Sequence, residues 1–284
     1  MNYTNILQLL RIKDWFKNLI IFFPIIFSVK FLELNNYFDL IITFIIFSIT
    51  SSIVYILNDI IDLNNDKKHP IKKSRPLASN KISIKESIYI LISLVFVGLI
   101  FLNFQKTIFI HILIYLVTSC IYILFLKKIP FLELLILSSL YLIRIDTGSL
   151  VINVESTHLM LLTTLIISIF FILLKRIGEL NLLKDNEFIQ TRSVLNFYNI
   201  TTLKNITILM IITFFILVFI YTYSTSFFLI LTFPFIFMFI YRYYLIAIRS
   251  TDGENPISLI LQNYFLIINI FATLFILITI LIYI

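Results

Sequence analysis

Residues 38–57 (FDLIITFIIFSITSSIVYIL) decide the fold, because they form an apolar run of about the 20 residues that one helix needs to cross a bilayer. Similar runs cover residues 19–31, 108–126 and 159–174. Each run is apolar on every face, whereas the strands of a transmembrane barrel alternate between polar and apolar residues. The sequence therefore predicts an all-α integral membrane protein.

The composition supports this prediction. The chain is 60% hydrophobic and 13% charged with a mean hydropathy of +1.04, whereas a soluble domain carries about 25% charged residues. Cys120 is the only cysteine, so no intramolecular disulfide is possible. The first ten residues mix polar and apolar side chains, so we expect no cleavable signal peptide.

Nine membrane spans are predicted within a single transmembrane domain, residues 1–284. A short amphipathic segment, residues 3–16, precedes the first span and suits the headgroup level of a bilayer. The predicted spans are residues 17–33, 38–58, 85–104, 107–126, 131–152, 158–176, 204–222, 226–244 and 262–284.

The distribution of Lys and Arg predicts the orientation in the membrane. With the N-terminus in the cytoplasm, basic residues gather in cytoplasmic connections, and only Lys30 and Lys106 fall outside. The three long connections, near residues 59–84, 175–203 and 245–261, are then all cytoplasmic. We therefore expect a multi-pass protein of the inner (plasma) membrane with its active site at the cytoplasmic face. The topology accounts for the basic excess, so no nucleic-acid binding is indicated, and the oligomeric state stays open.

The end of the second span carries an acidic motif, residues 58–66 (NDIIDLNND). Asp59, Asp62 and Asp66 stand at i, i+3 and i+7, so a continuing helix would place three carboxylates along one face. Such oxygen ligands suit Mg²⁺, which takes its remaining oxygens from water and substrate phosphates. We therefore expect these aspartates to bind Mg²⁺ and a diphosphate-bearing substrate.

A basic cluster of Lys72, Lys73 and Arg75 follows the acidic motif. These side chains suit phosphate oxygens. The alternative is that the lysines are ordinary solvated charges of a cytoplasmic loop. His69, which precedes Pro70, is expected to shape the loop through a hydrogen bond rather than to act as a general base.

The acidic motif and residues 69–79 (HPIKKSRPLAS) resemble the first aspartate-rich motif of the UbiA superfamily of intramembrane prenyltransferases. That motif reads N-D-x-x-D-x-x-x-D, followed by H-P-x-K-x-x-R-P-x-A-S. Within the superfamily the chain looks most like the decaprenyl-phosphate phosphoribosyltransferases. The resemblance implies a UbiA-type bundle that moves a 5-phosphoribosyl group from 5-phosphoribosyl 1-diphosphate to a polyprenyl phosphate and releases diphosphate.

Further segments carry the same resemblance. Residues 11–18 (RIKDWFKN) are similar to the R-x-x-x-W-x-K-N opening of the family, and Arg144 with Gly148 forms a second match. A loose match at residues 242–256 is given no role. The remaining match, to K-R-x-x-E-L…R-x-x-L-x-x-Y, is made by residues 175–180 (KRIGEL) with Arg192, Leu195 and Tyr198.

The match at residues 175–180 separates two kinds of family member. Members that ionise a prenyl diphosphate usually carry a second D-x-x-x-D motif here. This chain has Lys175, Arg176 and Glu179 instead, which fits a site for extra phosphate better than a second metal site. Glu179 and Asp185 keep some capacity for metal binding.

Three polar residues lie within the predicted spans, and each could have either a structural or a functional role. Arg144 lies inside the fifth span, where a guanidinium costs several kcal/mol unless it is paired or hydrated. It is interpreted either as an ion-pair partner, with Asp146 or with an acid on another helix, or as an anion ligand in a wet cavity. His111 and His158 fall on the external side, so no catalytic role is expected of them.

The resemblance implies a role for each candidate residue. Asp59, Asp62 and Lys17 are the expected catalytic residues, and Lys17 with its neighbours is placed to hold the lipid phosphate. Asp59, Asp62 and Asp66 are the expected metal ligands. The expected substrate-binding residues are Arg11, Asn18, Asn58, Lys72, Lys73, Arg75, Arg144, Lys175, Arg176, Glu179 and Arg192.

Two alternatives remain open. The first is a UbiA-type polyprenyltransferase that moves a prenyl group from a prenyl diphosphate to an aromatic or other acceptor, although the missing second acidic motif counts against it. The second is a transporter, which should show polar residues within several spans and discontinuous helices. Here the polar residues gather at one face.

Overall fold

The computed structural model describes residues 2–28, 30–69, 71–185, 193–249 and 256–283, and within these ranges it contains helices and no β-strand. The α-helices are α1 (Tyr3–Leu9), α2 (Phe23–Phe27), α3 (Leu34–Ile61), α4 (Leu63–Lys68), α5 (Ile84–Phe104), α6 (Phe109–Leu124), α7 (Leu132–Val151), α8 (His158–Asp185), α9 (Ile200–Thr225), α10 (Phe233–Arg249), α11 (Pro256–Gln262) and α12 (Tyr264–Tyr283). The 3₁₀-helices are η1 (Ile12–Phe22), η2 (Lys30–Leu32), η3 (Lys72–Ser74), η4 (Lys106–Ile108), η5 (Leu126–Lys128), η6 (Ser193–Phe197) and η7 (Phe227–Thr232).

Eight helices of the described ranges are long and apolar enough to cross a membrane. They coincide with the second to ninth predicted spans, α10 being extended by η7 and α6 by η4. Their length follows from uninterrupted apolar sequence, and their ends follow from local signals. Ser83, for example, begins α5 with a capping box in which its side chain and that of Glu86 each accept a hydrogen bond from the other's backbone N–H.

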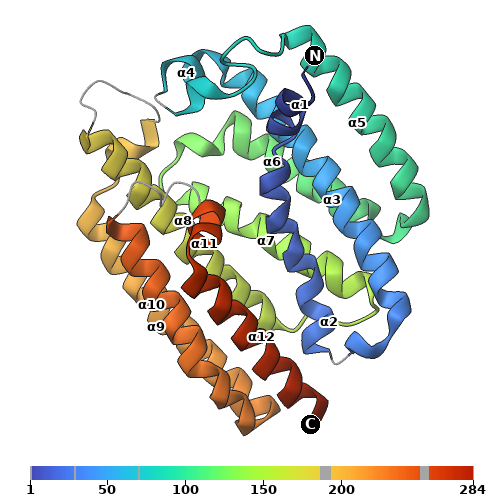
Figure 1. The fold of residues 1–284 in the computed structure, drawn as a ribbon, viewed down its shortest axis with the longest axis vertical. Coiled ribbons are helices and arrows are strands. Elements are labelled where there is room, and N and C mark those ends of the chain that lie inside the picture. The colour runs from blue at the N-terminus through green and yellow to red at the C-terminus, as the bar shows by residue number, and fades with distance from the viewer. Residues whose placement is uncertain (1, 29, 70, 186–192, 250–255, 284) are drawn as a thin grey trace.

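The first predicted span is not one continuous α-helix. The chain there runs through η1, then α2, then η2. A 3₁₀-helix rises about 2.0 Å per residue, so η1 and α2 together cover about 30 Å, which is the thickness of a bilayer's hydrocarbon core. The segment leads from α1 at one end of α3 to α2 at the other end (Figure 1). It therefore supplies a crossing without a long α-helix.

The η1 segment has three distinct faces, because side chains of a 3₁₀-helix repeat every three residues. One face points into the protein and carries Trp15, Asn18 and Ile21, the last two fully buried. The other positions form an exposed face of Lys13, Phe16 and Leu19 and a half-buried face of Asp14, Lys17 and Ile20.

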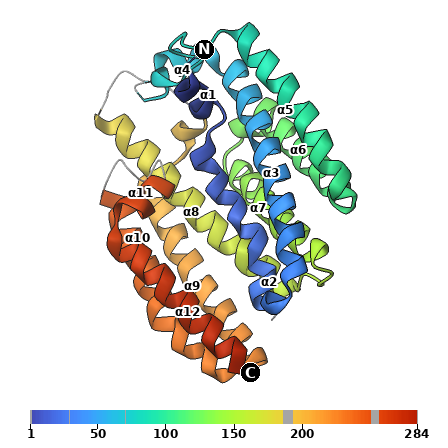
Figure 2. The same cartoon turned by 45° about the vertical axis from the view of Figure 1, so that its right-hand side comes forward.

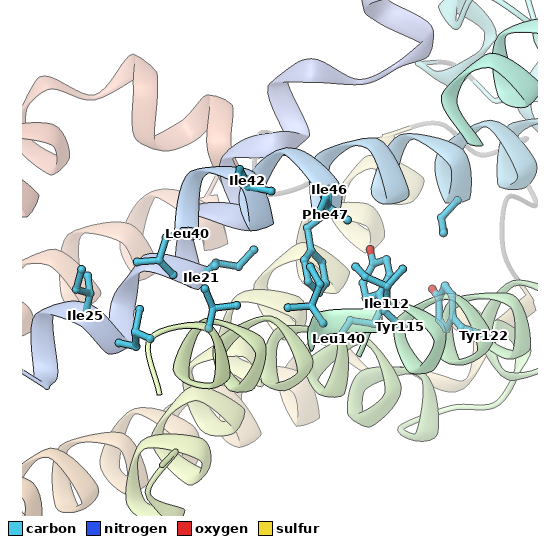
Figure 3. Close-up of a cluster of buried hydrophobic side chains, with 14 of the residues drawn as sticks. Ile21, Ile25, Leu40, Ile42, Ile46, Phe47, Ile112, Tyr115, Tyr122 and Leu140 are labelled. Carbon is cyan, nitrogen blue, oxygen red and sulfur yellow. The ribbon is translucent and has the colours of Figure 1, made fainter. Parts of the chain in front are cut away.

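The hydrophobic core consists of two large clusters joined by α7. One cluster packs α2, α3, α6 and α7 together and includes Ile21, Phe47 and Tyr115 (Figure 3). The other packs α8 to α12 around side chains such as Phe170. Leu137 of α7 contacts both clusters, so α7 is the common wall of the two halves.

Two short helices lie at one end of the bundle. Figures 1 and 2 show α1 and α4 at the end where the N-terminus lies, α11 at the end of α10 and α12 that is nearer to it, and the C-terminus at the opposite end. The connection near residues 59–84, which includes α4, therefore lies at the same end as α1. It carries the acidic motif and the basic loop, whereas Arg144 lies within α7 and Arg176 within α8.

Candidate functional site

A stripe of polar side chains on α3 faces the η1 segment. Ser48, Ser52, Tyr55 and Asp59 stand at i, i+4, i+7 and i+11, and therefore share one face of the helix. Ser48 Oγ accepts a hydrogen bond from Asn18 Nδ2 at 3.1 Å. This stripe holds η1 along its length and ends in the acidic motif.

The Trp15 indole adds a contact to the stripe. Its Nε1–H donates to Ser52 Oγ at 3.0 Å, and the Ser52 hydroxyl lies 2.8 Å from the Leu10 carbonyl oxygen. Small and hydroxyl side chains are typical of helix contacts in membranes, because they let backbones approach and satisfy polar groups. Apart from Asp59, the residues of this stripe were not among the predicted site residues, although the spacing of serine and tyrosine in an apolar span was a visible signal.

Two of the three predicted metal ligands share one ion network. Asp59 is 2% exposed and forms ion pairs with Arg11 and with Arg75, the latter at 3.1 Å. The same Arg75 nitrogen, Nη1, contacts Asp66 Oδ2 at 2.6 Å. One guanidinium nitrogen thus stands between two carboxylates that approach from the end of α3 and from α4.

Asp62 lies apart from this network, because the helix does not continue as predicted. Helix α3 ends at Ile61, Asp62 forms the junction, and α4 begins at Leu63. Asp62 pairs instead with Lys127 of η5 at 2.6 Å. The prediction of three carboxylates along one continuous helical face is therefore wrong, and the lysine that compensates Asp62 was not among the predicted site residues.

The donor set of Asp59 and Asp66 fits Mg²⁺. The described residues contain no group of three His, Cys, Asp or Glu side chains close enough to hold a metal ion. A magnesium site needs only one or two carboxylates, since water and substrate phosphates supply the other oxygens. The pair already holds one positive charge between its oxygens, in the form of Arg75 Nη1.

Lys17 and Arg11 gather beside this network. The Lys17 ammonium pairs with Asp14 at 2.6 Å and lies 5.9 Å from the Tyr55 ring centroid. The Arg11 guanidinium lies 4.8 Å from the centroid of the same ring. Lys17, Arg11 and Lys175 all attract the Asp14 carboxylate electrostatically. The structure therefore brings three predicted cations together from η1 and α8.

Arg11 also has an unusual backbone. Its φ of 52° and ψ of 48° lie in the left-handed region, which non-glycine residues seldom adopt. This conformation turns the chain from α1 into η1. Such strain persists only where the surroundings over-determine the conformation, and the Asp59 ion pair with the Tyr55 ring contact provides that restraint.

The basic loop is shaped by His69, as predicted. Its Nδ1 accepts hydrogen bonds from the backbone N–H groups of Ile71 at 3.2 Å and Lys72 at 3.3 Å. Lys72 and Lys73 form the turn η3, which leads directly to Arg75, and Lys73 is exposed. Asn58 is half-buried beside Asp59. Of these candidates, Arg75 is the one that contacts the carboxylates, while Lys72 and Lys73 precede it on the same loop.

Arg176 and Glu179 belong to a second, enclosed cluster. Arg176 is 1% exposed and holds Glu133 of α7 with two nitrogens, at 2.7 and 2.8 Å, while it also pairs with Glu179. The Tyr198 hydroxyl donates to Glu133 at 3.1 Å. Burial raises the pKa of Tyr198 to about 12, so this donor stays protonated at neutral pH.

Glu133, which is fully buried at the start of α7, was not among the predicted site residues. An acid at a predicted span boundary was the available signal. Arg192 and residues 250–255 lie outside the described residues, and so does most of the loose match to the family near residue 252. The predicted role of Arg192 therefore stays a prediction.

Arg144 is satisfied by neutral groups and not by an acid. It is 3% exposed, and its nitrogens donate to Asn18 Oδ1 at 2.7 Å, the Leu140 carbonyl at 2.7 Å and Tyr115 Oη at 2.9 Å. Asp146 instead bonds His111 at 3.1 Å and Ser156 at 2.5 Å. The ion pair that the sequence left open, with Asp146 or with an acid on another helix, is therefore not formed within the described part of the chain, and side chains two residues apart on a helix diverge.

These features define a class: a multi-pass α-helical membrane protein with a site of aspartates, arginines and lysines at one end of its bundle. The chain belongs to the UbiA prenyltransferase family, whose model matches residues 21–270. The matched region contains the acidic motif, the basic loop and the Arg176 cluster.

Two curated relatives show the range of the family around this chain. Over 175 residues it is 29% identical to nodulation protein NoeC of Azorhizobium caulinodans, covering 61% of this chain and 57% of NoeC. Over 203 residues it is 26% identical to decaprenyl-phosphate phosphoribosyltransferase of Corynebacterium glutamicum, covering 70% of this chain and 61% of that enzyme. The chain thus spans less than two thirds of the length of either relative.

Solved structures confirm the fold. A UbiA homologue from Archaeoglobus fulgidus bound to GPP and Mg²⁺ aligns with a TM-score of 0.64 at 16% identity, over 97% of this chain and 99% of that one. Digeranylgeranylglyceryl phosphate synthase aligns with a TM-score of 0.62 at 17% identity, over 99% of both chains. The predicted UbiA-type helical bundle is therefore correct.

Proposed function

We propose that this protein transfers a 5-phosphoribosyl group from 5-phosphoribosyl 1-diphosphate to a polyprenyl phosphate, with Mg²⁺, at the cytoplasmic end of its bundle. One observation favours 5-phosphoribosyl 1-diphosphate over a prenyl diphosphate as the donor. At the position where members that ionise a prenyl diphosphate carry a second acidic motif, Glu179 is held by Arg176. A carboxylate committed to a buried guanidinium is a poor ligand for a second metal ion. The named phosphoribosyltransferase relative supports the same choice.

The donor site in this proposal is the network at the end of α3. Asp59 and Asp66 would hold Mg²⁺, and the ion would supply neutralisation of charge on the diphosphate leaving group. Asp62, which pairs with Lys127 on η5, would join them only after leaving that partner. Arg75, Lys72 and Lys73 lie on the adjoining loop and donate to the phosphate oxygens. Arg75 already contacts both carboxylates. The residues that bind the metal and those that bind phosphate are therefore direct neighbours in this proposal.

The acceptor site in this proposal is the half-buried face of η1. Lys17 and Arg11 sit over the Tyr55 ring next to the donor network, where they hold the phosphate of the lipid. That phosphate is already anionic at pH 7, so its oxygen attacks the anomeric carbon without a strong general base. The anomeric C–O bond to diphosphate breaks as the new bond forms, with inversion. Positioning and charge neutralisation supply most of the catalysis.

The test is transfer of label from 5-[³²P]phosphoribosyl 1-diphosphate into the lipid phase, with purified full-length protein, a polyprenyl phosphate and Mg²⁺. We expect transfer by the wild type that is lost with chelator and lost in Asp59→Asn. Asp39→Asn is the matched control, since it changes a carboxylate on the same helix at the opposite end and should keep activity.

A parallel reaction separates the proposal from its rival. The same preparation is given a prenyl diphosphate and aromatic acceptors. Consumption of the prenyl diphosphate, with no label moving from the sugar donor, would establish a prenyltransferase and contradict the proposed donor. The family assignment would stand in either case.

A further inference from the structure

The guanidinium of Arg144 is held by hydrogen bonds that restrict the side chain's conformation. All three of its nitrogens are engaged, one by a side chain of η1, one by its own helix and one by Tyr115 of α6. Its guanidinium also lies 4.8 Å from the Tyr115 ring centroid and 5.4 Å from that of Tyr141. The rotamer is therefore fixed by the protein itself.

Asn18 connects this arginine to the active-site segment. Its Oδ1 accepts from Arg144 of α7, and its Nδ2 donates to Ser48 of α3. The side chain is fully buried, and both ends of its amide have protein partners. Asn18 thus fastens η1 between two long helices, one residue after Lys17.

A second contact, one 3₁₀ turn further along, holds the same face of η1. A Cβ atom built on Gly148 would lie 2.1 Å from the Ile21 carbonyl oxygen. The backbone of η1 therefore lies directly on α7, at a distance that only glycine permits. Arg144 and Gly148 are one helical turn apart on α7, so together they form a docking face for η1.

We propose that Arg144 is a positioning residue, which acts through Asn18 to fix the depth and rotation of η1 and thereby places Lys17 and Arg11. This inference deepens the proposed function and rests on it only for the identity of the substrates. A misplacement of about 1 Å can lower a reaction rate roughly 100-fold. The site is built on a 3₁₀-helix far longer than the usual three to four residues, so it depends on such external fixation.

Trp15 offers a direct readout of η1. It is the only tryptophan of the chain, it lies on η1 three residues before Asn18, and its indole is bonded to Ser52. Its fluorescence reports whether η1 is seated, with no substrate present. The experiment compares Trp15 emission and transfer rate in Arg144→Met, Arg144→Lys, Asn18→Ala, Asn18→Asp and the double variant Arg144→Met/Asn18→Ala.

We expect Arg144→Met and Asn18→Ala to shift Trp15 emission to longer wavelength and to lower transfer by about 10- to 100-fold. The double variant should be no slower than the worse single variant, because both remove the same link. Asn18→Asp should restore emission and most of the rate, since a carboxylate still accepts from Arg144. Asn181→Ala is the matched control, because it removes one interhelical asparagine bond, to the Ile248 carbonyl, away from η1; its emission should stay unchanged.

Two results would overturn the proposal. Loss of transfer in Arg144→Met with unchanged Trp15 emission would mean that Arg144 contacts substrate directly. Additive losses in the double variant would mean that the two residues act separately. If Arg144→Met does not yield folded protein, the same comparison of Trp15 emission with transfer rate is made in Arg144→Lys and Asn18→Ala. The emission result does not depend on which donor the enzyme uses, so failure of the proposed function leaves it intact.

Discussion

A single nitrogen of Arg75 contacts both Asp59 and Asp66, so in the proposed function this arginine competes with Mg²⁺ for the carboxylates and also binds phosphate. Arg75→Met should therefore change two constants in opposite directions. The concentration of Mg²⁺ needed for half-maximal binding in the absence of substrate should fall. The KM for the diphosphate substrate should rise by roughly 10- to 100-fold, as expected for the loss of a hydrogen bond to a charged group.

Metal titration of the substrate-free protein and initial-rate kinetics measure these two constants. Lys73→Met, which removes an exposed cation of the same loop, is the control and should change KM less. A weaker Mg²⁺ affinity in Arg75→Met would show that the guanidinium supports the metal site instead of competing for it.

Arg176 should matter for stability more than for chemistry. It is almost fully buried between Glu133 and Glu179, so Arg176→Met leaves buried carboxylates without their guanidinium. Breaking a buried pair in this way costs about 3–5 kcal/mol. Thermal unfolding in detergent should show a large loss, and Lys175→Met on the same helix a small one. A stable but inactive Arg176→Met protein would instead support the substrate contact predicted from the sequence.

The residue types of the site were predictable, but their pairings were not. Asp59 and Asp66 were proposed from their helical spacing at a span boundary and Arg75 from its place beside them, whereas Arg11 and Lys17 were proposed from the resemblance to the family's opening motif. Which cation meets which carboxylate depends on the break at Asp62, and the end of α3 one residue before this aspartate is not visible in the sequence. Lys127 and Glu133 were missed because isolated charges in short connections also fit ordinary topology.

At the scale of elements, the space around two glycines predicts opposite effects of substitution: Gly148 lies at the contact between η1 and α7, and Gly98 lies on α5. Gly148→Ala forces a methyl group against the Ile21 backbone and should destabilise the protein by about 1–3 kcal/mol, as overpacking does. Gly98→Ala meets only Ile49 Cγ2, at 3.4 Å, and should stabilise α5 by up to about 1 kcal/mol through helix propensity.

Thermal unfolding of the two variants under identical detergent conditions gives the comparison. Trp15 emission should move in Gly148→Ala and stay constant in Gly98→Ala. Equal stability of the two variants would show that η1 can move away from α7 without loss.

The long helices were predictable and the first crossing was not, for a physical reason. Hydropathy measures how apolar a segment is, and residues 17–33 are apolar enough for an α-helix. Whether the backbone winds with three or 3.6 residues per turn depends on partners elsewhere in the chain, here Ser48, Arg144 and Gly148. Tertiary contacts therefore override the local preference.

At the scale of the whole molecule, the irregular first crossing decides where the two ends of the chain lie. Eight crossings would put both ends on one side of the membrane, whereas nine put them on opposite sides. Tyr3 and Tyr283 are 71% and 90% exposed, so the rest of the protein covers neither position. In a Cys120→Ser background, a membrane-impermeant maleimide added to intact cells should label Tyr283→Cys and spare Tyr3→Cys.

Permeabilised cells provide the control, because both cysteines should then react. Labelling of both variants in intact cells would contradict the nine-span topology, and labelling of Tyr3→Cys alone would reverse the predicted orientation. The positive-inside distribution of Lys and Arg is the basis of the expected result.

The threefold repeat of η1 also limits how this segment can change in length. Inserting or deleting one residue would rotate everything beyond it by about a third of a turn, and would send Asn18 or Lys17 to the wrong face. A change of three residues keeps every face in register and moves the two ends by about 6 Å. Homologues that keep this geometry should therefore carry gaps here in multiples of three, whereas gaps in the neighbouring α-helices should follow spacings of three, four or seven.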